Sequence, residues 1–179
     1  MLISEAGLLQ TLIDRIKPAS VLDCGSGNKV DRTIVQPHIG AVFAGHNVTW
    51  TNLKSENGDE IECDFTKPAT LADLPRCELV TSCSMLEHVE DIDGAIQCIA
   101  ALACDWLIVS VPFTYPLHDC PIDNGWRPDP EELAEKVEAC GFTCVEKYVA
   151  GPERFGAVED ARVSLVVARR TPAEVQKDE

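Results

Sequence analysis

The sequence predicts an α/β fold in which a mainly parallel β-sheet carries helices on both faces. Strand-like and helix-like stretches alternate through the first five predicted strands, which is typical of parallel βα units. The continuous apolar run 106–111 has the composition of a central strand buried on both faces. The short apolar strand 21–24 leads into a glycine turn, which is where such sheets bind ligands.

The composition is that of a folded protein rather than a disordered one. Of 179 residues, 45% are hydrophobic and 25% are charged, which suits one domain with a full hydrophobic core. We expect this domain to span 1–170, with a flexible tail at 171–179. No apolar run reaches the roughly 20 residues of a membrane helix, and the first residues lack the pattern of a signal peptide. We therefore expect a cytoplasmic protein.

The acidic balance of the chain bears on its partners. Fifteen Lys and Arg against 30 Asp and Glu give a formal net charge of −15, which disfavours nucleic acids and anionic membranes. We expect a small-molecule substrate, and a homo-oligomer stays open. The nine cysteines include no CxxC pair, and reduced, mostly buried thiols are expected.

Three amphipathic helices follow from apolar residues that recur on one helical face. They span 4–16, 91–104 and 130–140, the last with Asp129 as its cap and Pro130 in its first position. Two further segments are less regular. Residues 28–46 suggest a short helix interrupted by prolines and glycines, and a brief helix is expected at 69–74.

The remaining strands are predicted from β-branched, aromatic or alternating residues that lie between turn residues. They span 48–53, 61–65, 78–83, 142–149 and 162–168. A polar loop at 151–160 is expected between the last two. The long connection 112–128 holds five prolines or glycines, and so long a connection in a compact domain is usually functional.

The glycine turn after the first strand can be compared with nucleotide-binding turns. Gly25 and Gly27 let the backbone approach a ligand closely because neither carries a Cβ. A dinucleotide fingerprint needs a third glycine, but Val30 stands there, and the carboxylate of Asp23 would repel a pyrophosphate. A cationic cofactor with an amino-acid tail and no phosphate suits this turn better. S-adenosylmethionine has that chemistry.

Five motifs in order carry a resemblance to a known family. They are 21–27, 62–65, 86–89, 111–118 and 121–127, and they lie within residues 21–141. In these motifs the sequence resembles the class I S-adenosylmethionine-dependent methyltransferases, and the last two look like the small type 11 branch. The resemblance implies a three-layer sandwich of the Rossmann-like methyltransferase type, with a seven-stranded, mainly parallel sheet whose last strand runs antiparallel.

The function implied by the resemblance is S-adenosylmethionine-dependent methyl transfer to a small molecule or metabolite. An alternative is a methyltransferase-like domain without catalysis that serves as a binding or interaction module. A nicotinamide-dependent oxidoreductase is a more distant third. Two departures from the family pattern favour the alternative: Lys29 replaces the third glycine, and Asn52 replaces the acid that usually binds both ribose hydroxyls. An amide loses the charge-assisted hydrogen bonds that a carboxylate makes.

The resemblance assigns further cofactor contacts to individual residues. Asp23, Gly25 and Gly27 would line the methionine end of the cofactor. Ser82 and Cys83, at the end of their strand, would lie near the sulfonium and the tail.

The resemblance assigns the adenine end of the cofactor to the motif at 62–65. Asp64 would accept a hydrogen bond from the adenine amino group, and the Phe65 N–H would donate to a ring nitrogen. Asp59 or Glu56 would replace Asn52 at the ribose if the register of the second strand were different.

Catalysis of methyl transfer rests on positioning, with a general base where the nucleophile must lose a proton. His118 in the long connection and His88 after the fourth strand are the candidates for base or substrate contact. The alternatives are a loop-ordering hydrogen bond for His118 and helix capping for His88. Glu87 with both histidines could also form a metal site, but no metal is expected, since Ser84 stands where metal-binding relatives have a first glutamate.

Arg127 is a third candidate for contact with the substrate. It could bind a substrate carboxylate or phosphate through two N–H groups. An internal salt bridge to Asp123 or Asp129 is the alternative, and the sequence does not choose between the two.

Overall fold

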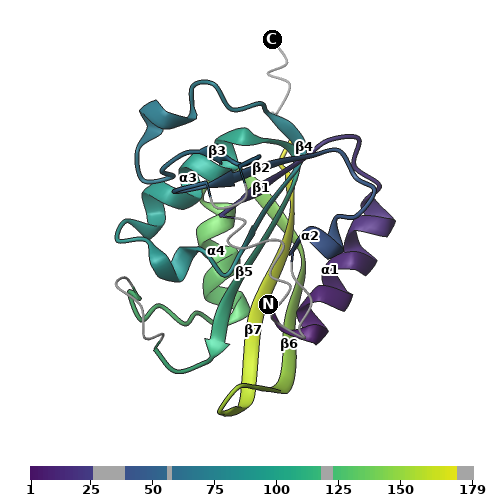
Figure 1. Ribbon diagram of the computed structural model, residues 1–179, viewed down its shortest axis with the longest axis vertical. Coiled ribbons are helices and arrows are strands. Elements are labelled where there is room, and N and C mark those ends of the chain that lie inside the picture. The colour runs from purple at the N-terminus through teal and green to yellow at the C-terminus, as the bar shows by residue number, and fades with distance from the viewer. Residues whose placement is uncertain (26–38, 56–57, 118–122, 173–179) are drawn as a thin grey trace, which may run out of the picture.

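The computed structural model describes residues 1–25, 39–55, 58–117 and 123–172. Within these residues, seven strands form one sheet in the order β3-β2-β1-β4-β5-β7-β6 (Figure 1). The strands are β1 (Val21–Cys24), β2 (Val48–Asn52), β3 (Ile61–Glu62), β4 (Cys77–Cys83), β5 (Ala103–Thr114), β6 (Phe142–Phe155) and β7 (Val158–Arg170). Strand β7 is antiparallel to both of its neighbours, and the other neighbouring pairs are parallel. The predicted seven-stranded, mainly parallel sheet is confirmed.

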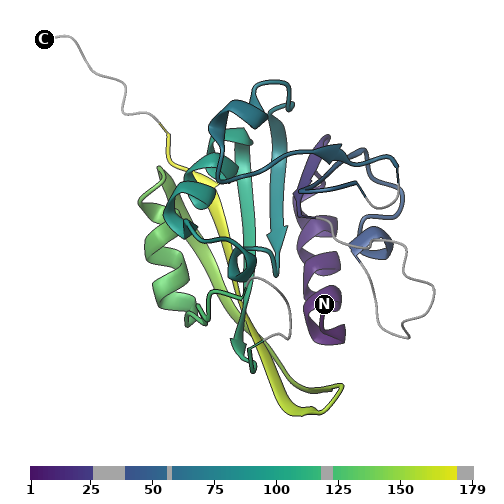
Figure 2. The ribbon, with the colours of Figure 1, turned by 60° about the vertical axis from the view of Figure 1, so that its left-hand side comes forward.

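Helices cover both faces of this sheet. They are α1 (Ile3–Ile16), α2 (Ile39–Val42), α3 (Ile92–Leu102) and α4 (Pro130–Glu138), with the 3-10 helices η1 (Pro68–Leu71) and η2 (Leu86–His88). Figure 2 shows α1 and α2 on one face and α3 and α4 on the other. Each face has its own cluster of buried apolar side chains. The fold is therefore the expected three-layer sandwich.

Strand β5 confirms the prediction of a central strand buried on both faces. Leu107 and Val109 belong to the core under α3 and α4, whereas Ile108 between them belongs to the core under α1. All three side chains are at most 1% exposed. Since neighbouring side chains of a strand point to opposite faces, only a strand covered on both sides needs a continuous apolar run.

The loop predicted at 151–160 is wrong, because β6 and β7 continue through it as a hairpin. Phe155 pairs with Val158 next to the turn, and Glu153 pairs with Ala161. The hairpin projects beyond the end of β5 (Figure 1). Its apolar side chains are few, since only Ala150, Ala161 and their neighbours pack against the start of α1. A hairpin that is mostly exposed has no strong alternating pattern and therefore resembles a polar loop in sequence.

Other boundaries also differ from the prediction. Strand β3 covers only two residues of the predicted 61–65, and the helix expected at 69–74 is the short η1. Helix η2 was not predicted. Of the ambiguous segment 28–46, the structure describes only residues 39–46, which include α2. Turns of three or four residues carry too few apolar positions for a periodic signal.

The structure tests three further expectations only in part. In the described ranges, the helices are too short or too polar to cross a membrane. The eight cysteines among those residues are free, and four of them are buried. The expected tail lies outside the described residues from residue 173 onward, and the extent of the domain stays a prediction.

Candidate active site

The turn after β1 is tied to the strands on either side of it. The Asp23 side chain is 1% exposed, and its Oδ1 accepts a hydrogen bond of 2.6 Å from Thr81 Oγ1 on β4. The hydroxyl of Thr51 on β2 donates to the Asp23 carbonyl at 2.7 Å. Gly25 has a φ of +76°, a conformation that favours glycine, and its N–H donates to the Thr51 carbonyl at 3.1 Å. The end of β1 and Gly25, the first residue of the turn, are therefore fixed at the carboxyl edge of the sheet.

A cavity of about 660 Å³ opens beside this turn. Four of the residues predicted to bind the cofactor line it, namely Gly25, Asn52, Asp64 and Phe65. They come from the ends of β1 and β2 and from the loop after β3. Because these strands are parallel neighbours, their ends meet at one edge of the sheet. His88 also lines this cavity.

The Asp64 carboxylate is ionised and has a fixed orientation. Lys67 Nζ lies 2.6 Å from Oδ2, and the hydroxyl of Thr66 donates to Oδ1 at 2.6 Å. Hydrogen bonds first from Lys67 and then from Thr66 lower the pKa of Asp64. A carboxylate oxygen accepts more than one hydrogen bond, so Asp64 can still receive one from a ligand amino group.

Asn52, which the resemblance assigns to the ribose, lines the cavity, and its contact with the ribose stays a prediction. It is the last residue of β2 and is paired in register with Glu62 of β3. Its Oδ1 accepts a hydrogen bond of 3.0 Å from the following N–H of Leu53. Of the two alternatives, Asp59 is exposed and is not among the lining residues, and Glu56 lies outside the described residues.

Three predicted residues are not among those that line this cavity. Asp23 is buried below the turn, and Ser82 is fully buried with no hydrogen-bond partner for Oγ in the described ranges. Cys83 packs on the side of α1, where burial raises the pKa of its thiol well above the usual value. Their contacts with the sulfonium and the tail stay predictions. Gly27 lies outside the described residues.

Met85 is a lining residue that the sequence did not single out. Its side chain lies directly against Gly25, so that a Cβ at Gly25 would overlap Met85 Cγ. The space above the glycine turn is therefore shared between a flexible methionine and any ligand that enters it. Methionine has three rotatable bonds and adapts to such a site.

A second cavity of about 310 Å³ lies on the far side of Ser84 and His88, which line both cavities. Ser84 has a φ of +51°, which is uncommon for a residue other than glycine. Its N–H donates to the carbonyl of Ser110 at 2.9 Å and so ties the turn after β4 to β5. Backbone strain of this kind is often found at functional sites.

Two buried glutamates stand in the wall of the second cavity. Glu5 of α1 accepts hydrogen bonds from Ser110 Oγ at 2.6 Å and from the Leu2 N–H at 3.1 Å. Burial raises its pKa above the usual value. Glu87 of η2 is 0% exposed, and within the described ranges neither carboxyl oxygen has a hydrogen-bond partner. Its Oε1 lies 3.7 Å from His88 Nε2, and burial raises the pKa of Glu87 to about 8.

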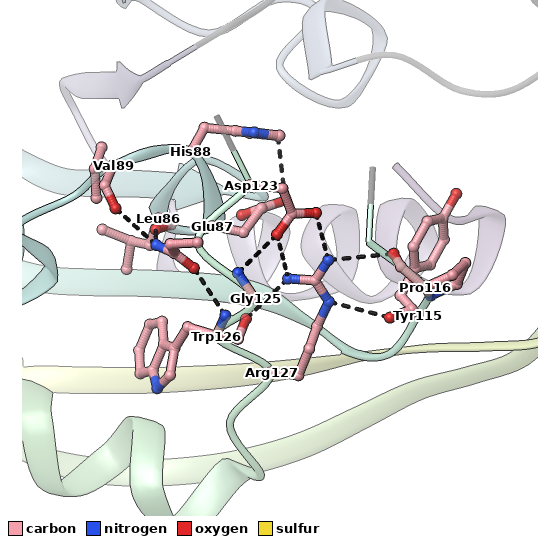
Figure 3. A network of polar contacts seen from close by, with 11 residues as sticks. Leu86, Glu87, His88, Val89, Tyr115, Pro116, Asp123, Gly125, Trp126 and Arg127 are labelled. Carbon is pink, nitrogen blue, oxygen red and sulfur yellow. Dashed lines mark hydrogen bonds and ion pairs between the residues drawn. The ribbon is translucent and has the colours of Figure 1, made fainter. Parts of the chain in front are cut away.

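Helix η2 is held in place by the end of the long connection (Figure 3). Asn124 donates through its N–H to the Glu87 carbonyl at 2.9 Å. Its side-chain amide donates to the carbonyls of Leu86 and Val89 at 2.8 and 2.7 Å. These contacts bring segments 35 or more residues apart together at the carboxyl edge of the sheet.

Arg127 forms the internal salt bridge that the sequence left as an alternative. Its Nη1 and Nη2 donate to the two carboxylate oxygens of Asp123 at 3.2 and 2.7 Å (Figure 3). The remaining N–H groups donate to the carbonyls of Tyr115, Pro116 and Trp126. All five N–H donors are therefore engaged within the protein. Binding of a substrate anion by Arg127 stays a prediction and would require this network to open.

Of the two remaining catalytic candidates, the structure describes only His88. His88 stands between the two cavities, and its side chain is 37% exposed. His118 lies outside the described residues. No group of three His, Cys, Asp or Glu side chains suited to a metal ion occurs within the described ranges. The trio of Glu87, His88 and His118 includes one residue outside these ranges.

Comparisons with known proteins identify the fold. No family model and no curated protein matches the chain. Among solved structures, the 1,6-didemethyltoxoflavin-N1-methyltransferase of Burkholderia thailandensis, with its substrate and S-adenosylhomocysteine bound, has a TM-score of 0.69 at 20% identity. The match covers 95% of this chain and 80% of that one. A candidate methyltransferase of Bacillus halodurans C-125 has a TM-score of 0.68 at 13% identity, over 94% of this chain and 100% of that one.

A third similar structure has another activity. It is a [4+2]-cyclase, with a TM-score of 0.64 at 14% identity, over 94% of this chain and 82% of that one. The chain thus has the Rossmann-like fold of class I S-adenosylmethionine-dependent methyltransferases. This fold serves more than one reaction, so the function has to be argued from the site.

Proposed function

We propose that this protein is an S-adenosylmethionine-dependent methyltransferase that acts on a small molecule. The observation that carries the proposal is the 660 Å³ cavity, which is lined by Gly25, Asn52, Asp64 and Phe65 at the carboxyl edge of the sheet. Gly25, Asp64 and Phe65 also belong to the motifs that carry the resemblance to class I methyltransferases. Solved structures of this fold, including the Burkholderia thailandensis methyltransferase, contain S-adenosylhomocysteine.

The residues around the cavity fit a cationic cofactor without phosphate. Its described lining residues include Asp64, Glu90 and Asp91 but no lysine or arginine. A pyrophosphate would lack a cationic partner there, whereas a sulfonium and an ammonium would not be repelled. When bound, S-adenosylmethionine supplies an electrophilic methyl group. Asp64 and Phe65 would hold the adenine, Asn52 the ribose, and the turn at Gly25 the methionine end.

Binding of S-adenosylhomocysteine tests this proposal directly. Calorimetric titration of the wild-type protein is expected to show binding, and Asp64→Ala should weaken it about tenfold because one hydrogen bond to the adenine is lost. Asp59→Ala is the control, since Asp59 is an exposed aspartate that is not among the lining residues. Thermal unfolding of each variant shows whether it remains folded. Equal affinities in Asp64→Ala and the control would contradict this placement of the adenine.

Two observations favour the alternative of a methyltransferase-like module without catalysis. Met85 occupies space above the glycine turn, and the ribose position carries Asn52 rather than an acid. Both would weaken the affinity for the cofactor. Absence of binding at millimolar S-adenosylhomocysteine would support this alternative, and the same titration with NAD tests the more distant oxidoreductase.

Restoring the acid at the ribose position is expected to tighten cofactor binding. Asn52→Asp would allow charge-assisted hydrogen bonds to the ribose hydroxyls, worth about 1–2 kcal/mol, or roughly tenfold in Kd. Calorimetry with S-adenosylhomocysteine measures the change. Asn47→Asp is the matched control, since Asn47 is exposed and lies just before the opposite end of β2. An unchanged or weaker affinity in Asn52→Asp would show that the ribose lies elsewhere.

A further inference from the structure

The smaller cavity is placed to receive the second substrate. It has a volume of about 310 Å³ and shares Ser84 and His88 with the cavity assigned to the cofactor. Its other walls come from the start of α1, from the end of β5 and from β7, through residues such as Leu2, Pro112 and Val163. Ser84 and His88 therefore lie at the boundary that a methyl group would cross from one cavity to the other.

The charged groups around this cavity are mainly acids. Glu5 and Glu87 stand in its wall, and His88 is the only basic side chain among its described lining residues. The nearby Arg127 has all of its donors engaged with Asp123 and with backbone carbonyls. A carboxylate or phosphate that entered the cavity would find two buried acids and no free guanidinium, and the α-amino group of Met1 already acts on Glu5, whose pKa it lowers.

The carboxyl group of Glu87 has no hydrogen-bond donor among the described residues. Its side chain is 0% exposed, and neither carboxyl oxygen accepts a hydrogen bond from the described residues. Glu5 differs, because Ser110 and the backbone of Leu2 donate to it. A buried carboxyl group without a partner costs free energy, and a ligand that brings an N–H donor would recover it.

Building on the proposed function, we propose that the smaller cavity binds the methyl acceptor and that the accepting atom is an amine-type nitrogen whose N–H groups are received by Glu87. The lone pair of the nitrogen forms the bond to the methyl carbon. The carbon–sulfur bond breaks and its electron pair stays on sulfur. Before this attack, the ammonium group of the entering amine favours ionisation of Glu87, whose proton leaves to solvent, and one N–H proton then passes from nitrogen to the carboxylate and frees the lone pair. The product leaves as the methylated ammonium ion. His88 and Ser84 position the two molecules on either side of the transfer path.

Binding of three probes of equal size tests the preference for nitrogen. Benzylamine, benzyl alcohol and benzoate share one ring and differ in the charge of the attached group. Each is titrated calorimetrically into the protein with and without saturating S-adenosylhomocysteine. Benzylamine is expected to bind at least about tenfold more tightly than benzoate because it forms charge-assisted hydrogen bonds.

Glu87→Gln is expected to abolish this preference, since the amide has nearly the same shape but cannot ionise beside an ammonium group. Glu135→Gln, an exposed glutamate of α4, is the matched control and should retain it. Glu5→Gln should reduce the preference by a smaller factor, because that carboxyl group is already hydrogen-bonded.

The outcomes separate this proposal from the function proposed above. Failure of S-adenosylhomocysteine to bind refutes the cofactor assignment, while the probes still report on the smaller cavity. Binding of S-adenosylhomocysteine together with equal or tighter binding of benzoate would overturn the amine assignment alone. It would also be overturned if none of the probes bound at millimolar concentration, or if Glu87→Gln kept the wild-type preference.

Discussion

Glu87→Gln is expected to stabilise the protein above neutral pH and to remove much of the pH dependence of its unfolding free energy. The pKa of Glu87 rises from 4.5 to about 8 because the carboxyl group is buried away from water. Arg127 lowers this pKa, whereas the nearby acids Glu5 and Asp123 raise it, all to a lesser degree. In the unfolded chain the group regains its ordinary pKa.

The sign of the effect follows from proton linkage. Between pH 4.5 and about 8 the folded protein keeps the proton on Glu87 while the unfolded chain has released it. The contribution of this proton to the free energy of unfolding is therefore fully present at low pH. It falls as the pH rises through this interval, by about 1.4 kcal/mol per pH unit. Over the whole interval the loss reaches roughly 4 kcal/mol. Glutamine does not titrate and so escapes this loss.

Urea unfolding at pH 5, 6, 7 and 8 measures this difference. The free energy of unfolding of the wild-type protein should fall more steeply with pH than that of Glu87→Gln, and the two curves should diverge toward pH 8. Glu5 contributes a slope of the same sign to both proteins, since its pKa is also raised by burial. Glu135→Gln should follow the wild-type curve. Parallel curves for the wild type and Glu87→Gln would show that Glu87 is ionised in the folded protein.

Asp123→Ala is expected to destabilise the protein by about 3–5 kcal/mol, because it leaves a largely buried guanidinium without its carboxylate partner. The side chains of Arg127 and Asp123 are only 13% and 4% exposed, and two hydrogen bonds join them. Asp123 also accepts a hydrogen bond of 2.9 Å from the Gly125 N–H. In a chain of this size the midpoint of thermal unfolding should fall by about 10 °C.

Asp160→Ala provides the control for this prediction. Asp160 pairs with Arg162 on the hairpin, but the two side chains are 55% and 38% exposed. Exposed pairs contribute about 1 kcal/mol or less. The double variant Asp123→Ala/Arg127→Met should recover part of the lost stability because it removes the unpaired charge. If Asp123→Ala cost no more than Asp160→Ala, the buried pair would not stabilise the long connection.

The residues of the larger cavity could be predicted from the sequence because they follow strands directly. Gly25 and Asn52 come at or just after the ends of buried or β-branched strands, and Asp64 belongs to a short motif. Parallel strands bring such positions to one edge whatever the details of packing. The sheet itself was predictable for the same reason, since alternation and apolar runs are local patterns.

The walls of the smaller cavity could not be predicted in this way. Glu5 and Ser110 are 105 residues apart, and the contact of Glu153 with Ile3 spans 150 residues. In sequence, Glu5 looks like a solvent-facing or capping residue of an amphipathic helix, and only the folded chain shows that it is buried. The same holds for Arg127. An internal salt bridge and a bound substrate anion require the same residue type in the sequence, and only the folded chain shows the contact with Asp123.

The side chain of Glu153 joins the hairpin of β6 and β7 to the start of α1 by hydrogen bonds. The carboxylate of Glu153 accepts hydrogen bonds from the N–H groups of Ile3 and Ser4 at 2.6 and 2.9 Å. The smaller cavity therefore depends on segments from both halves of the chain, whereas the larger one is built entirely from residues 25–91. Substitutions in the hairpin can thus reshape one cavity and leave the other unchanged. In the proposed assignment, such substitutions would change the choice of methyl acceptor and leave the binding of the cofactor unaltered.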